Sequence, residues 1–135
     1  MRNEELVARF YEGIKESDSR KLSECVHRNF ELTWQGSTQI PWAGTWTGVT
    51  GLLDFFSTLS DHATVIDIDV QHTVANEDVT IVILRGKWSV GPQSTELEAR
   101  AANVFAFEGE RIRSYMVLND TEAFAKALEG TQPDL

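Results

Sequence analysis

The sequence is poor in cysteine and in long apolar runs. Cys25 is the only cysteine among 135 residues, so no internal disulfide can form, and a reducing compartment suits the chain. The longest aliphatic run, residues 79–84, is far too short to cross a bilayer. The opening MRNEELVARF is charged and lacks the apolar stretch of a secretory signal. We therefore expect a cytoplasmic protein without a membrane partner.

Positive charge is scarce as well. Twelve Lys and Arg stand against 21 Asp and Glu, which gives a formal net charge of −9. Such a surface repels phosphate backbones, so nucleic acid is not an expected partner. The histidines His27, His62 and His72 are scattered without metal-ligand spacing, and no phosphate-binding glycine loop is found. The sequence predicts neither a metal nor another cofactor.

Apolar residues make up 41% of the chain, enough for one core without staples. We expect a single domain over residues 1–135, with an ordered part at about 3–128 and a frayed tail at 129–135. Its first third is helical. Apolar residues recur at spacings of three and four from Leu6 to Ile14, Asp18 can cap a second helix, and Val49 to Leu59 mark a third. A short strand is predicted at 31–34 and a loop rich in Gly, Pro and Trp at 36–48.

The apolar period then changes from 3.6 to 2. Strands are predicted at 63–75, 80–90, 95–107 and 110–118, with turn residues between them and a short helix at about 121–128. Three helices followed by an antiparallel meander indicate an α+β fold. In the third of these strands, Leu97, Ala99, Ala101, Asn103, Phe105 and Phe107 share an apolar face that should meet the helices. The opposite face is small or mixed, which suits packing on a second copy of the chain.

Several segments together resemble the SnoaL-like proteins. They are ARFYEGI, His27 to Phe30 with the following ELTW, PWAGTWTGVTGLLDFF and VFAFEGERIRSYMVLNDTEAFAKAL. This family belongs to the nuclear transport factor 2-like superfamily, with ketosteroid isomerase and limonene epoxide hydrolase. The resemblance implies a curved antiparallel sheet around helices, a cone with an apolar pocket inside, and a homodimer formed through the outer face of the sheet.

The catalytic residues of ketosteroid isomerase do not carry over. That enzyme uses an aspartate base, a tyrosine and a protonated aspartate. Alignment without gaps puts Trp34 at the base and Phe10 at the tyrosine, and Tyr11 lies about 100° further round the helix, so it is no simple substitute. The protonated aspartate falls on Asn103, whose amide could donate to a developing oxyanion. Asn103 could equally satisfy a buried backbone group.

Asp120 matches an aspartate that acts as a base in SnoaL-type cyclases and in limonene epoxide hydrolase. The hydrolase's arginine and further aspartate fall on Ala101 and Asn103, so epoxide hydrolysis is disfavoured. A cyclase needs only one carboxylate in an apolar pocket, where burial makes a better base near neutral pH. Asp120 is also a good N-cap for the last helix, and a cap requires no chemistry.

The pocket lining is expected among the aromatic residues. By the resemblance, the loop around Trp42 lies near the pocket entrance, where this ring could close over a ligand. The other predicted substrate-binding residues are Trp34, Tyr115, Phe10, Phe56 and Phe105, although most large rings in a small domain are simply core.

The sequence thus leads to a homodimeric pocket protein for a small apolar carbonyl compound. The leading hypothesis is cofactor-independent proton transfer, a cyclisation or isomerisation with Asp120 and Asn103 as catalytic residues. The alternatives are a non-catalytic small-molecule binder, a dimeric accessory protein and an epoxide hydrolase-like enzyme.

Overall fold

The computed structural model describes residues 2–130, and the predicted tail beyond residue 130 lies outside this range. The elements are α1 (Asn3–Glu16), α2 (Ser19–Cys25), β1 (Val26–Trp34), β2 (Gly44–Thr47), α3 (Gly48–Ser60), β3 (Ala63–Ala75), β4 (Val79–Val90), β5 (Thr95–Glu108), β6 (Arg111–Leu118) and α4 (Thr121–Leu128).

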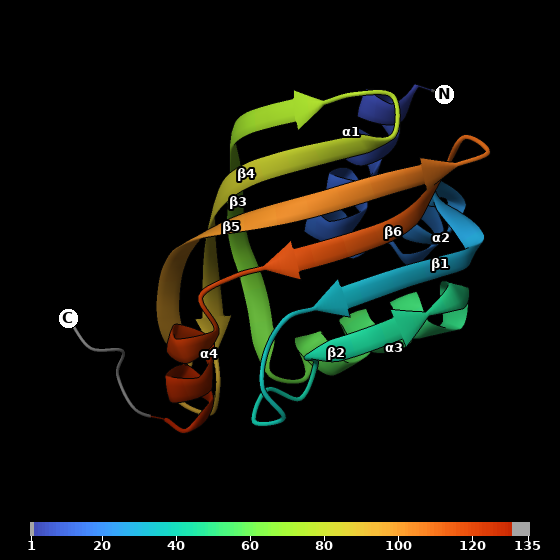
Figure 1. Ribbon diagram of the computed structural model, residues 1–135. Helices are drawn as coiled ribbons and strands as arrows, with labels where there is room; N and C mark the ends of the chain where they lie inside the picture. Colours follow the sequence, from blue (N-terminus) through green and yellow to red (C-terminus); the bar gives the residue numbers. More distant parts are fainter. Residues whose placement is uncertain (1, 131–135) are drawn as a thin grey trace.

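The strands form one curved sheet in the order β2-β1-β6-β5-β4-β3. Figure 1 shows α1, α2 and α3 together behind one face of this sheet, with α4 near the end of the strands. The α+β cone predicted from the sequence is confirmed. The sheet is mixed rather than wholly antiparallel, because β1 runs parallel to β6 with Leu32 opposite Tyr115.

Two elements differ from the predictions. The first strand begins at Val26 instead of residue 31, and its buried Phe30, Leu32 and Trp34 alternate as a half-buried strand requires. The segment 36–48, predicted as a loop, contains β2. There Thr45 and Trp46 pair with Thr33 and Leu32 of β1. Thr-Trp-Thr is a strand-type sequence too short for a periodicity signal.

The side chains of β5 alternate between the inner face of the sheet, which meets the helices, and the outer face. Leu97, Ala101, Asn103 and Phe105 are buried on the helix side, as predicted. Glu98 and Arg100 are exposed on the other side. The inner face of the strand therefore carries two buried polar side chains, those of Thr95 and Asn103, into an otherwise apolar core.

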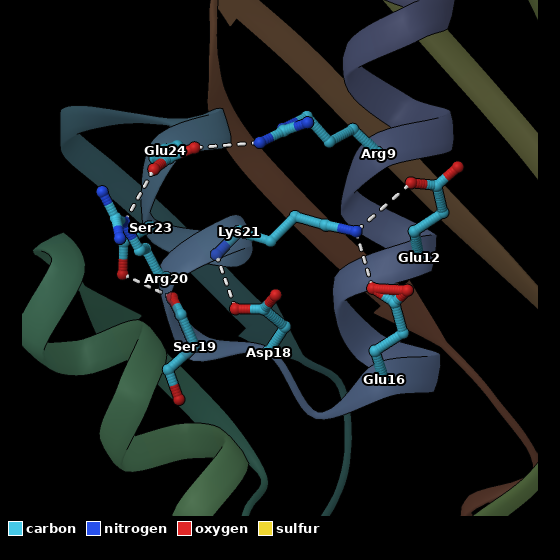
Figure 2. A network of polar contacts seen from close by, with 9 residues as sticks. All are labelled: Arg9, Glu12, Glu16, Asp18, Ser19, Arg20, Lys21, Ser23 and Glu24. Atoms are coloured by element: carbon cyan, nitrogen blue, oxygen red, sulfur yellow. Dashed lines mark hydrogen bonds and ion pairs between the residues drawn. The ribbon is translucent and has the colours of Figure 1, made fainter.

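A network of polar contacts joins α1 and α2 (Figure 2). Asp18 caps α2 by accepting a hydrogen bond from the Lys21 amide at 3.1 Å. The Lys21 ammonium lies 2.6 Å from a carboxylate oxygen of Glu16 on α1. Gly13 allows the close approach of the two helices, since a Cβ there would lie 2.9 Å from Leu22. Surface ion pairs contribute little to stability, so the buried contact of Gly13 and Leu22 sets the spacing.

Candidate functional site

The inner face of the sheet lines a small, partly open cavity of about 60 Å³. Its wall is mostly apolar and rich in aromatic side chains, which include Trp34, Trp42, Trp88 and Phe124. Their contacts are edge-on, with the centroid of Phe124 at 5.4 Å from that of Trp34 and 5.2 Å from that of Trp88. Pockets for drug-sized ligands hold about 300–1,000 Å³. As it stands, the cavity fits only a molecule of a few heavy atoms.

Gly86 on β4 positions one of these rings. A Cβ at this position would lie 2.1 Å from the indole of Trp88. The Trp88 ring therefore lies flat over the backbone of its own strand, which only glycine permits at this distance. The Trp88 ring is thereby fixed in the wall of the cavity.

A polar triad lies in the same wall. The hydroxyl groups of Tyr11 on α1 and Tyr115 on β6 both donate to Oδ1 of Asn103, at 2.7 and 3.2 Å. All three side chains line the cavity and are buried. Because the bonds use only the carbonyl end of the amide, the Nδ2 donors of Asn103 can serve an acceptor in the cavity.

Burial raises the pKa of both tyrosines above the ordinary value of 10, and the neighbouring Tyr115 adds to the effect at Tyr11. Both hydroxyls are therefore neutral donors at physiological pH. They hold the Asn103 amide in one orientation, and they are poor bases. Such fixed, neutral donors suit an oxygen that gains negative charge more than a proton that must be removed.

The triad includes a residue that the sequence argument dismissed. The gapless alignment put Phe10 at the tyrosine position, but Tyr11 is the residue that reaches Asn103. Phe10 lies in the core behind the tyrosines, edge-on to Phe105 and Tyr115. The sequence reasoning did not take into account how α1 lies on the sheet. Tyr11 is rotated by about 100° from Phe10 around the helix axis, and its long side chain still reaches Asn103 on β5.

Trp42 forms part of the cavity wall and not a lid. Its side chain is fully buried, with its ring 5.6 Å from that of Trp34 between centroids. Within residues 2–130 its indole Nε1 has no hydrogen-bond partner. A buried donor without a partner costs about 1–3 kcal/mol. An acceptor atom of a ligand or a water in the cavity would offset that cost.

The structure places the remaining predicted lining residues in two groups. Trp34, Tyr115 and Phe56 line the cavity. Phe105 lies behind the triad, stacked on Tyr115 at 4.9 Å between ring centroids. Like Phe10, it supports the wall from within the core.

Asp120 lies on the other side of the sheet. Its Oδ1 accepts a hydrogen bond from the Ala123 amide at 3.1 Å, which caps α4. The side chain is exposed and borders a shallow outer hollow with Arg100 and Leu118. Of the two interpretations of Asp120 left open by the sequence, a base in the pocket and a cap of the last helix, the contact observed is the cap. Asp120 lies beyond the end of β6, and the preceding Asn119 borders both the cavity and the outer hollow.

Across residues 2–130, no group of three His, Cys, Asp or Glu side chains is placed to hold a metal ion. In the same range, no helix is both long and apolar enough to span a membrane.

Comparisons with known proteins agree with this architecture. The SnoaL-like domain family matches residues 7–115. No functionally curated protein matches the sequence. Among solved structures, an NTF2-like protein from Burkholderia xenovorans superposes with a TM-score of 0.80 at 20% identity, over 93% of this chain and 95% of that one.

Two further structures contain small molecules. TerC, co-crystallised with polyporic acid, has a TM-score of 0.84 at 15% identity, over 94% of this chain and 98% of its own. A protein with a ketosteroid isomerase-like fold from Catenulispora acidiphila, in complex with trimethylamine, has a TM-score of 0.76 at 12% identity, over 94% and 93%. At such identities the likeness establishes the fold alone.

Proposed function

We propose that this chain, which belongs to the SnoaL-like family, binds a small, mostly apolar organic compound through a carbonyl or similar oxygen. The observation that carries the proposal is the polar triad in a wall that is otherwise mostly apolar. Asn103 is 3% exposed and is held by two tyrosine hydroxyls, and Trp42 adds an unpartnered donor to the same wall. Complexes of two fold relatives with trimethylamine and polyporic acid support a small-molecule role.

The ligand oxygen would accept hydrogen bonds from Asn103 Nδ2 and Trp42 Nε1. Apolar atoms would contact the rings of Trp34, Trp88 and Phe124. Hydrogen bonds in this setting polarise a carbonyl, and they strengthen when the oxygen gains charge on enolisation. The donors need no cofactor for this task.

Proton transfer with Asp120 as the base, as in a cyclase or isomerase, is the second candidate. The carboxylate uses Oδ1 for the cap of α4, and Asp120 directly follows Asn119, which lines the cavity. A base at this position requires the segment before α4 to turn, because the carboxylate faces outward in the structure. Binding without conversion needs no such movement and is therefore the first candidate.

The cytoplasmic location and the homodimer remain predictions. The outer face of the sheet supports a dimer, because Ile81 and Leu118 are 37% and 43% exposed there. Apolar side chains in a group on a sheet face are typical of an interaction surface.

Cyclopentanone and cyclopentane form a suitable probe pair, since they match in size and differ by one oxygen. Ligand-observed NMR should show the ketone bound at least about ten-fold more tightly than the hydrocarbon, in line with a hydrogen bond to a rigid donor. The variant Asn103→Leu should abolish this difference. Equal binding of both probes, or a ketone preference that survives in Asn103→Leu, would contradict the proposal.

Hydrogen–deuterium exchange at the α-carbon of cyclopentanone in heavy water separates the two candidates. Exchange that is catalysed by the native protein and lost in Asp120→Asn, with ketone binding retained, would favour the enzyme. Binding without catalysed exchange would favour the binder.

A further inference from the structure

A second hollow lies on the helix side of the molecule, and it is much larger than the interior cavity. This groove holds about 450 Å³ between the end of α1, helix α3 and the beginning of β3. Its apolar floor includes Leu22, Leu53 and Phe56. Serine and lysine side chains complete the lining, among them Ser57, Ser60 and Lys15.

The groove and the interior cavity share one wall. Ile14, Phe56, Leu59 and Val65 line both spaces. These side chains come from three elements, α1, α3 and β3, and each is only partly buried. The cavity and the groove are therefore adjacent, and these four side chains lie at the boundary between them.

We propose that the groove is the entrance to the interior cavity, with Phe56 and its three neighbours as the gate. The expected entrance at the Trp42 loop does not fit, because that ring is fully buried. The groove provides the volume that the small cavity lacks. A ligand that occupies both spaces can be elongated, with one end at the triad and the other in the groove. This inference rests on the proposed function for its inner end.

Lys15 indicates which chemical group the ligand carries at the end that lies in the groove. It is exposed on the rim of the groove and has no ion-pair partner within residues 2–130, whereas Lys21 nearby is paired with Glu16 and Glu12. On a chain with a net charge of −9, an unpaired cation beside an apolar groove favours an anionic group. The ligand class is thus an apolar compound with a carboxylate or similar anion at the end that stays in the groove.

Two fluorescent probes test the groove directly. N-Phenyl-1-naphthylamine is neutral, and 1-anilinonaphthalene-8-sulfonate has the same rings with an added sulfonate. We expect the native protein to bind both. Lys15→Gln should weaken binding of the sulfonate by about five-fold, a usual upper value for one exposed charge, and leave the neutral probe unchanged. Lys87→Gln removes the same charge on β4, away from the groove, and should change neither.

Blocking the groove gives the second arm of the test. Ser57→Trp fills the groove from the exposed side of α3, and we expect both probes to bind at least ten-fold more weakly. Thr50→Trp places the same ring at an exposed position of α3 outside the groove and should have no effect. Phe56→Ala removes the largest gate side chain, so the neutral probe should associate faster in stopped-flow measurements. Unchanged probe binding in both Ser57→Trp and Lys15→Gln would overturn the inference.

The small ketone distinguishes this inference from the proposed function. If cyclopentanone still binds Ser57→Trp at the native rate but fails to bind Asn103→Leu, the triad site stands and the entrance lies elsewhere. If instead both probes depend on Ser57 and Lys15 while the ketone never binds, the groove is a site of its own and the proposed function fails.

Discussion

The two polar residues predicted to be catalytic, Asn103 and Asp120, differ in their surroundings: one is buried on the inner face of the sheet and the other is exposed. Asn103 on the inner face is 3% exposed and accepts hydrogen bonds from Tyr11 and Tyr115. Asp120, just beyond the end of β6, is exposed and accepts one bond from the α4 backbone. The carboxylate of Asp120 is a stronger base than the amide of Asn103, yet it is Asn103 that lines the cavity. Whether a polar residue can contact a ligand in the cavity thus depends first on which side of the sheet it lies and only then on its side-chain type.

The largest effect is expected on the outer face. Val104 lies opposite Ile81 and Met116 in the strand register, so the three form an apolar row across β4, β5 and β6. If this row is the dimer interface, Val104→Glu buries a carboxylate there and should weaken the dimer at least about 100-fold, since an unpaired buried charge costs several kcal/mol. Light scattering over a dilution series measures this.

Thr50→Glu is the matched control for Val104→Glu, because it introduces the same charge at an exposed position of α3. It should leave the dimer intact. If the native protein is monomeric at high concentration, the outer face of the sheet is not a dimer interface.

On the inner face, Asn103→Leu should be strongly destabilising. Two buried tyrosine hydroxyls lose their common acceptor, at about 1–3 kcal/mol each, so we expect a loss of roughly 2–6 kcal/mol in the free energy of unfolding. Urea denaturation provides the measurement. Tyr11→Phe removes one hydroxyl and keeps the bond of Tyr115 to Asn103, so it should cost only about 1 kcal/mol. A tolerated Asn103→Leu would mean that water already satisfies the tyrosines.

The tyrosines also make the inner face sensitive to alkali. Burial raises the pKa of both above 10, so their contribution to stability is complete below pH 10 and is lost as the pH rises above it. There the unfolded chain releases protons that the folded chain retains. Each tyrosine should lower the free energy of unfolding by about 1.4 kcal/mol per pH unit in this range.

The chain contains only these two tyrosines, so tyrosinate absorbance reports on the triad alone. It should rise only together with alkaline unfolding, monitored by circular dichroism. Tyr115→Phe should reduce the slope of stability against pH by half. A native protein whose tyrosinate signal titrates near pH 10 while still folded would show that the triad is open to water.

The sequence predicted the parts of the molecule that depend on local pattern. The long strands and α4 follow from period-2 and period-3.6 repeats, and the α4 bounds of 121–128 are those observed. The inward position of Asn103 follows from the same alternation. The parallel pairing of β1 with β6 could not be predicted. It joins residues more than 80 positions apart, and its hydrogen bonds are between backbone groups, so the side chains carry no signal for it.

The candidate site was predicted less well, for a related reason. Asn103 and Trp34 both line the cavity. Strand alternation predicted the inner face for Asn103, whereas Trp34 was chosen from the aromatic residues. Tyr11 was dismissed, because the reach of a helix side chain across to β5 depends on how α1 lies on the sheet. The sequence left Asp120 open between a base in the pocket, implied by the resemblance, and a cap of the last helix, because its orientation depends on how the chain turns after β6.

The smallest effect is expected at Asp120, and it distinguishes a cap from a base. Asp120→Ala removes the hydrogen bond to the Ala123 amide and should lower the free energy of unfolding by about 1 kcal/mol. Asp120→Asn keeps a capping oxygen and should be nearly neutral in stability. Ketone binding should be native in both variants, because the carboxylate lies on the outer side of the sheet. A loss of ketone binding in Asp120→Asn, at unchanged stability, would mean that the carboxylate reaches the cavity in solution and that the two faces are less separate than their side chains indicate.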